Sequence, residues 1–213
     1  MSLITLKNVK KEYGKNQVLF ENLSLEIEKG EFVGQSGAGK TTLLNIIGLI
    51  TDISEGTITI DSHKNLSMNG KNAMILRRYT IGYLFQNYGL IEDESVLWNL
   101  KLALEYKKVK KEEKLKLINK YLKQFELSDM LNKKVYQLSG GEQQRIAIIK
   151  LILQESQIIL ADEPTSGLDK ENELIVMKLL KELNEKGITI IMVTHNMNLC
   201  DCFSRVINVE NFR

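Results

Sequence analysis

The chain has 213 residues, a length that suits one substantial domain, and 43% of them are hydrophobic and 26% charged. Its 29 basic residues nearly balance its 27 acidic residues. This balance argues against a general nucleic-acid binder, which needs a concentrated basic surface. No apolar run approaches the roughly 20 residues that cross a bilayer, and the N-terminal segment lacks the apolar core of a secretory signal.

Cys200 and Cys202 are the only cysteines, too few for a disulfide framework. A zinc site would need further ligands, and the only histidines are His63 and His195. We therefore expect two reduced thiols in a cytosolic protein.

The first part of the chain is rich in predicted strands, because short segments alternate apolar and polar side chains or are continuously apolar. These segments are residues 3–9, 23–28, 57–60 and 81–85. A helix is expected to begin near Lys40. From about Ser95 to Tyr136, apolar residues recur at three- and four-residue spacing, which predicts helices.

Strands and a helix alternate in the last third of the chain. Residues 158–161 and 188–193 are continuous apolar runs, as expected for a parallel sheet that is buried on both faces. Residues 170–186 predict an amphipathic helix that ends at Gly187. Residues 205–209 predict one more strand.

This order of elements predicts an α/β fold with a P-loop NTPase core, a parallel sheet, an N-terminal antiparallel β subdomain and an inserted helical subdomain. We expect a single domain over residues 1–213. Residues 1–86 and 138–213, approximately, would form the core with the β subdomain. Residues 87–137, approximately, would form the helical subdomain.

Residues 34–41 read GQSGAGKT and match the phosphate-binding pattern G-x-x-x-x-G-K-[ST] in full. The glycines let the backbone bend so that N–H groups point at phosphate oxygens. Lys40 supplies a positive charge, the Thr41 hydroxyl is a magnesium ligand, and the following helix directs its positive end at the anion. The motif alone predicts a nucleoside triphosphate bound with magnesium. The residues expected around the phosphates are Gly34, Gln35, Ser36, Gly37, Ala38, Gly39, Lys40, Thr41 and Thr42.

The strand before this motif is too short. A phosphate-binding loop is expected to follow a buried strand of about five to six residues, yet only Glu31, Phe32 and Val33 separate Gly30 from Gly34. Either the strand is truncated, or a few residues are missing from the sequence as it stands. We expect the second, because every later motif is intact. An intact-mass measurement that matches the 213 residues would refute this expectation.

Residues 158–163 read IILADE, an apolar strand that ends in two carboxylates. Their position places them at the carboxyl edge of the sheet, beside the phosphate loop. Asp162 is expected to hold Mg²⁺. Glu163 is expected to orient and deprotonate the attacking water, which is worth about 10²- to 10⁴-fold in rate.

Residues 138–145 read LSGGEQQR. With the phosphate loop and the IILADE strand, this string resembles the ATPase subunits of ABC transporters, and the family's motifs follow in order along nearly the whole chain. Tyr13 matches the aromatic residue that stacks on adenine, Gln86 in YLFQN the Q-loop, Asp169 in SGLD the D-loop and His195 in VTHN the switch histidine.

The resemblance implies ATP and Mg²⁺ as cofactors and a homodimer that sandwiches two ATP molecules head to tail. The residues implied to reach the partner subunit's nucleotide are Ser139, Gly140, Gly141 and Asp169. The implied catalytic residues are Glu163, His195, Gln86 and Lys40. The implied metal ligands are Thr41, Gln86 and Asp162.

Three of these residues also have a structural explanation. Tyr13 follows a strand and suits a surface turn, Ser139 precedes a helix and suits an N-cap, and His195 follows a buried strand. The presence of the phosphate loop in the same chain favours the functional interpretation.

The resemblance further implies integral membrane permease subunits encoded by separate genes and a peripheral position on the cytoplasmic face of a bacterial membrane. Within the family, the chain is similar to the branch for lipoprotein release, macrolide efflux and bacteriocin export, and bacteriocin export is the most similar. We therefore expect export of a bacteriocin, peptide or lipophilic substrate.

The alternatives are a soluble P-loop ATPase or a kinase that is not coupled to transport. A DNA-repair ATPase of the same family would carry long coiled coils, and a translation-associated one would carry two ATPase units. A kinase would explain the phosphate loop but not LSGGEQQR or SGLD.

Overall fold

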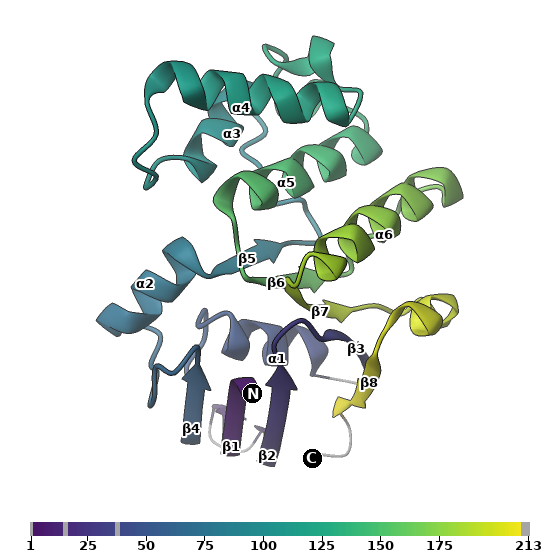
Figure 1. Ribbon diagram of the computed structural model, residues 1–213. Helices are drawn as coiled ribbons and strands as arrows, with labels where there is room; N and C mark the ends of the chain where they lie inside the picture. Colours follow the sequence, from purple (N-terminus) through teal and green to yellow (C-terminus); the bar gives the residue numbers. More distant parts are fainter. Residues whose placement is uncertain (1, 15–16, 37–38, 210–213) are drawn as a thin grey trace.

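The computed structural model describes residues 2–14, 17–36 and 39–209. An antiparallel sheet in the order β2-β1-β4 forms one end of the molecule (Figure 1). It consists of β1 (Ser2–Tyr13), β2 (Gln17–Glu28) and β4 (Glu55–Ile60). Buried and exposed residues alternate over parts of these strands, most regularly at residues 23–28 of β2, which is the period that predicted them. The antiparallel β subdomain is thereby confirmed, with strands longer than the patterns predicted.

The second sheet has the order β5-β6-β7-β3-β8, and all its neighbouring strands are parallel. Its strands are β3 (Phe32–Ser36), β5 (Ile81–Leu84), β6 (Ile158–Asp162), β7 (Thr189–Val193) and β8 (Arg205–Asn208). Every residue of β7 is buried, in agreement with a sheet covered on both faces. The predicted α/β fold is confirmed.

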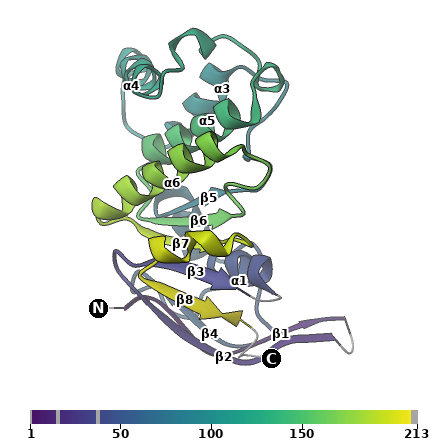
Figure 2. The same cartoon turned by 90° about the vertical axis from the view of Figure 1, so that its right-hand side faces the viewer.

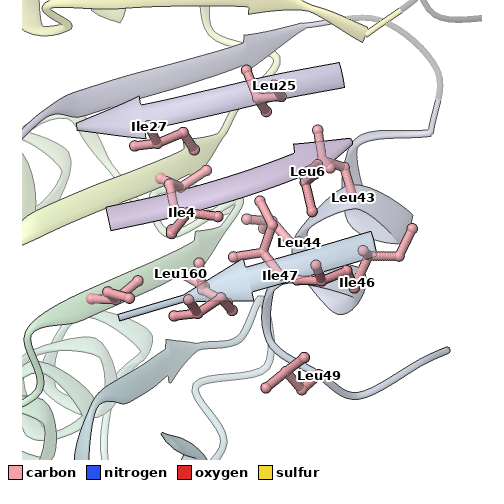
Figure 3. Close-up of a cluster of buried hydrophobic side chains, with 14 of the residues drawn as sticks. Ile4, Leu6, Leu25, Ile27, Leu43, Leu44, Ile46, Ile47, Leu49 and Leu160 are labelled. Carbon is pink, nitrogen blue, oxygen red and sulfur yellow. The ribbon is translucent and has the colours of Figure 1, made fainter. Parts of the chain in front are cut away.

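Helix α1 (Lys40–Ile47) lies between the two sheets (Figures 1 and 3). One hydrophobic cluster joins its inner residues, such as Leu43 and Ile47, to Ile4 and Leu6 of β1 and to Leu160 of β6. Figure 3 shows these side chains meeting under the antiparallel strands. The cluster therefore fixes the first turn of α1 relative to the carboxyl end of β6.

The remaining helices lie on the other side of the parallel sheet or at its edge (Figure 2). They are α2 (Lys71–Tyr79), α3 (Val96–Ala103), α4 (Lys111–Gln124), α5 (Gly140–Gln154) and α6 (Lys170–Glu185), with short 3₁₀ turns at Ser128–Met130, Val135–Gln137 and Met197–Cys202. A second hydrophobic cluster joins α3, α4, α5 and α6 to the sheet. The helices α3 and α4 fall inside residues 87–137, where a helical subdomain is predicted. Helix α2 has no counterpart among the predicted elements.

The short strand before the phosphate motif is completed from the motif itself. Strand β3 has five residues because Gly34, Gln35 and Ser36 continue it. Gly34 pairs with Met192 of β7, and Gln35 pairs with Val193. The first residues of the motif thus lie in the sheet and not in a loop.

No helix in the described part of the chain combines the length and apolarity needed to cross a membrane.

Candidate nucleotide site

A cavity of about 390 Å³ lies at the carboxyl ends of β6 and β7, beside the first turn of α1. Open α/β sheets bind their ligands at this edge. Six residues that the sequence predicts to act on a bound nucleotide line this sheet-edge cavity. They are Lys40, Thr41, Gln86, Asp162, Glu163 and His195.

Thr41 and Asp162, two of the predicted metal ligands, lie next to each other on one side of the cavity. The Thr41 hydroxyl donates a hydrogen bond to Asp162 Oδ1 at 3.4 Å. Burial raises the pKa of Asp162 above its ordinary value, and the Thr41 hydrogen bond only partly offsets this effect. A hydroxyl and a carboxylate side by side are hard oxygen ligands, so the donors present here fit Mg²⁺.

Glu163 occupies the position immediately after β6. Its backbone is in the left-handed region, with φ of 48°, and its N–H donates to Val193 O at 3.0 Å. Oε2 accepts a hydrogen bond from the backbone N–H of His195 at 3.2 Å. Oε1 is buried and makes no hydrogen bond, and it lies 3.4 Å from His195 Nε2 and 4.0 Å from Lys40 Nζ. A fixed carboxylate with one buried oxygen that makes no hydrogen bond suits a group that accepts a proton from water.

Lys40 turns its ammonium group toward His195 and Glu163. Nζ lies 3.0 Å from Nδ1 and 3.1 Å from Nε2 of His195, and 4.0 Å from Glu163 Oε1. The Lys40 side chain is 9% exposed, whereas that of His195 is 81% exposed. The lysine charge is therefore held inside the cavity, and the histidine covers it from the solvent side.

Asn196 and Glu173 are among the polar residues of the cavity that were not predicted. Asn196 Nδ2 donates to both carboxylate oxygens of Glu173, at 3.2 and 3.1 Å. This pair joins the end of β7 to α6 and holds the segment that carries His195. The adjacency of Asn196 to His195 in VTHN was the only available signal, and nothing in the sequence pointed to Glu173.

The phosphate motif is divided between strand and helix. Gly34, Gln35 and Ser36 lie in β3, and Gly37 and Ala38 fall outside the described residues. Gly39 precedes α1 with φ of 99°, a conformation that favours glycine. α1 then begins at Lys40, as the sequence predicts.

Tyr13 and Thr42 lie next to each other at the end of β1 and the start of α1. Their hydroxyl oxygens are 3.3 Å apart. Tyr13 is exposed, and Lys11 Nζ lies 4.7 Å from the centre of its ring. The ring is therefore on the surface near α1, where a base could stack on it.

Ser139, Gly140 and Gly141 of LSGGEQQR, which we call the signature, lie outside the sheet-edge cavity. Ser139 is the N-cap of α5, and its hydroxyl accepts a bond from the N–H of Glu142 at 3.4 Å. Glu142 in return accepts bonds from the Ser139 N–H and hydroxyl at 2.7 and 2.8 Å, which lower the pKa of its carboxyl. Asp169 is likewise the N-cap of α6 and accepts a bond from Asn172 N at 2.8 Å.

A parallel sheet with carboxylates at its edge, next to a helix that follows G-x-x-x-x-G-K-[ST], defines a P-loop NTPase. Residues 20–166 match the family model for the ABC transporter ATP-binding domain. The chain therefore belongs to the ABC transporter ATPase family. It is an ATPase, and its cofactors are ATP and Mg²⁺.

Relatives of similar length and longer relatives both match nearly the whole chain. It is 41% identical over 212 residues to a macrolide export ATP-binding/permease protein, MacB, of Campylobacter jejuni, which covers 98% of this chain and 33% of that protein. The chain thus spans about a third of the length of this relative. It is 40% identical to an ABC transporter ATP-binding protein of Methanocaldococcus jannaschii, MJ0796, covering 98% of this chain and 94% of that protein.

The solved structures agree with this assignment. A dimeric, post-hydrolysis structure of MJ0796 bound to ADP and phosphate matches with a TM-score of 0.87 at 39% identity, covering 96% of this chain and 93% of that one. A structure of CbiO1 of Clostridium perfringens, described as part of the CbiONQ ABC transporter complex, matches with a TM-score of 0.83 at 26% identity, covering 97% of this chain and 84% of that one.

Proposed function

We propose that two copies of this chain close around two Mg-ATP molecules and that hydrolysis drives export through separate membrane subunits at the cytoplasmic face of a bacterial membrane. The observation that carries the proposal is the separation of the two phosphate-binding elements. The signature, Ser139 to Gly141, begins a helix but contributes nothing to the cavity that holds Lys40. A helix N-terminus of this kind binds anions, so its ligand is supplied by a second copy.

The metal and phosphate interactions follow from the cavity. Bound magnesium neutralises phosphate charge and orients the transferring group. Thr41 and Asp162 hold the metal, Gln86 contacts it or the attacking water, and Lys40 binds the phosphates. The motif backbone from Gly34 to Thr42 surrounds them, and Tyr13 stacks on the adenine.

Glu163 and His195 act on the water. Oε1 of Glu163 is the buried oxygen that makes no hydrogen bond, so it receives the proton as the water attacks. The Oε2 atom stays bonded to the His195 backbone, which keeps the carboxylate oriented. The His195 ring, largely exposed, contacts the γ-phosphate. In the dimer, Ser139 to Gly141 and Asp169 complete the site from the partner subunit.

The surface near the Q-loop is suited to a membrane partner. Exposed large hydrophobic residues gather on the segment that follows β5 and on α3, namely Phe85, Ile91, Trp98 and Leu102. A cavity of about 280 Å³ borders this segment and is lined by Ile50, Phe85, Tyr88 and Lys150 among others. Exposed large apolar groups, where they gather on one surface, mark interaction sites. We propose that a permease subunit binds here and receives the movement of Gln86.

The substrate is proposed from the relatives. MacB proteins are named for macrolide export, whereas a relative of Lactobacillus acidophilus that is 41% identical is named for phosphonate import. The MacB relatives, and the similarity of the chain to the branch for lipoprotein release, macrolide efflux and bacteriocin export, favour export of a lipophilic or peptide substrate. A bacteriocin is the specific candidate.

Mixed dimers test the composite site. Lys40→Ala removes the positive charge that binds the phosphates, and Ser139→Arg blocks the N-terminus of α5 at the signature. Each variant alone is therefore expected to be inactive. Mixed in equal amounts, they are expected to recover about a quarter of wild-type Mg-ATP hydrolysis, because half of the dimers are mixed and each contains one complete site. Lys64→Ala, in an exposed turn, is the control. No recovery in the mixture would refute the shared site.

The base is tested separately. Glu163→Gln is expected to lower the hydrolysis rate by about 10²- to 10⁴-fold and to elute as an ATP-dependent dimer in size-exclusion chromatography. Glu171→Gln, exposed in the first turn of α6, is the control. A variant that hydrolyses ATP at the wild-type rate would show that Glu163 is not the base.

A soluble ATPase or kinase without a transport partner is the alternative. Co-purification with a multispanning protein encoded beside this gene distinguishes the two. Phe85→Asp is expected to abolish that co-purification while the isolated chain still hydrolyses ATP.

A further inference from the structure

Strand β3 reaches the carboxyl edge of the sheet only by using residues of the phosphate motif. Phe32 and Val33 pair with Ile190 and Ile191 of β7, and the next two positions are filled by Gly34 and Gln35. Gln35 pairs with Val193, which in turn pairs with Asp162 of β6. Without the motif residues, β3 would end two positions below the metal-binding carboxylate.

The same residues are paired on their other side. Gly34, Gln35 and Ser36 pair with Val206, Ile207 and Asn208 of β8, respectively. Because β3 lies between β7 and β8 (Figure 2), the backbone of Gly34 and Gln35 is engaged in the sheet on both sides, and that of Ser36 on the β8 side.

Side-chain packing fits the strand position as well. A β-carbon at Gly34 would overlap the ring of Phe203. That ring also packs edge-on against Phe32, with the ring centres 5.2 Å apart. In this arrangement Gly34 serves close packing in the sheet, and the absence of a side chain is required there.

This arrangement leaves few backbone N–H groups of the motif free to bind a phosphate. In the motif, the N–H groups between the first glycine and the lysine turn inward around the phosphates. Here the strand ends at Ser36 and α1 begins at Lys40, so three residues connect them. A backbone N–H that is bonded within the sheet is not free to bind a phosphate.

Lys40 is also occupied by the protein itself. Its Nζ lies 3.0 Å from His195 Nδ1 and 4.0 Å from Glu163 Oε1. A triphosphate must therefore displace two sets of internal interactions, one along β3 and one around Lys40.

We propose that this arrangement is a self-inhibited state, in which ATP binds only by withdrawing Gly34 to Ser36 from β3. The length of β3 then sets the affinity for ATP. This inference rests on the proposed role of the motif in ATP binding.

A three-residue insertion tests the proposal. Gly-Ile-Val inserted between Val33 and Gly34 supplies three strand residues, with a glycine to face Phe203, and releases the motif. The matched control carries three residues, Gly-Ser-Gly, between the exposed Lys64 and Asn65. The probe is the magnesium complex of the non-hydrolysable analogue AMP-PNP, titrated by calorimetry. The β3 insertion is expected to bind it at least tenfold more tightly than wild type, a difference of about 1.4 kcal/mol, and the control insertion to bind it as wild type does.

Amide hydrogen exchange tests the same proposal without a variant. In the described part of the chain, β8 is an edge strand that pairs with β3, so withdrawal of Gly34 to Ser36 removes this pairing at residues 206–208. The magnesium–AMP-PNP complex is expected to speed exchange at these amides in wild type, and to leave them unchanged in the β3 insertion variant. The phosphates lie at the motif, so they do not shield β8.

The outcomes separate this inference from the proposed function. If wild type binds the analogue as tightly as the β3 insertion and residues 206–208 stay protected, the self-inhibited state is refuted while ATP binding at the motif stands. If neither protein binds the analogue, both the inference and the proposed nucleotide site are refuted. If the β3 insertion does not fold, exchange at residues 206–208 of wild type decides.

Discussion

Asn99 ties the segment that follows the Q-loop to helix α3, and its removal is expected to destabilise the chain measurably. Its side chain is fully buried. Oδ1 accepts a bond from the Ile91 N–H at 2.8 Å, and Nδ2 donates to Ile91 O at 3.0 Å and to Ser95 O at 3.1 Å. Asn99→Ala leaves the Ile91 N–H without this partner, whereas Ile91 O still accepts the bond from the Glu94 N–H at 3.2 Å and Ser95 O that from the Asn99 N–H at 3.0 Å.

The magnitude follows from the Ile91 N–H, the group that loses its partner. A buried polar group left unsatisfied costs about 1–3 kcal/mol, and the low end applies because the Ile91 side chain is exposed and water can approach. We expect Asn99→Ala to lower the free energy of unfolding by about 1 kcal/mol. For a chain of this size, that corresponds to a melting temperature lower by about 2–4 °C.

Urea denaturation followed by circular dichroism measures the effect, with the exposed Asn132→Ala as the control. The control is expected to stay within about 0.5 kcal/mol of wild type. An Asn99→Ala midpoint equal to that of wild type would show that Asn99 does not hold this segment, and the assignment of its three hydrogen bonds would be wrong.

Three further variants test the site and the sheet. Burial raises the pKa of Asp162, so its carboxyl stabilises the fold below its ordinary pKa and loses that contribution as the pH rises through the raised pKa. Asp162→Asn is therefore expected to raise the melting temperature of the metal-free chain at about pH 7.5 but not at about pH 3. Thermal scans at the two pH values measure this. Ser139→Ala removes the α5 N-cap and is expected to cost about 1 kcal/mol in urea denaturation and to reduce ATP hydrolysis; retention of full stability would refute the cap. Gly82→Ala places a β-carbon against Leu151 and Ser156 and is expected to cost about 1–3 kcal/mol by the same measurement, whereas an unchanged midpoint would show that β5 can shift without cost.

The strands and the sheet-edge cavity could be predicted because their signals are local. The apolar run of residues 158–161 ends at Asp162, and parallel strands bring their carboxyl ends to one edge. That rule alone places Asp162 and Glu163 near Lys40 and His195, and the structure has all four in one cavity.

The remaining features depend on pairing between distant segments. The sequence indicates that the strand before Gly34 is short, but only the register with β7 and β8 shows that the motif fills the gap. Asn99 and Glu173 act through side-chain hydrogen bonds to residues 8 and 23 positions away, respectively. Helix α2 has a weak apolar pattern, with only Ala73 and Leu76 buried, so periodicity did not reveal it.

The left-handed backbone at Glu163 has an evolutionary consequence. A glutamate at φ of 48° costs free energy that glycine or asparagine would largely avoid. Selection for stability alone would therefore replace Glu163. Selection for ATP turnover alone would keep it, because Glu163 is the proposed base. Thermostabilised versions of this chain, obtained from libraries screened only by heat resistance, are expected to accumulate substitutions at this position and to lose catalysis as they gain melting temperature.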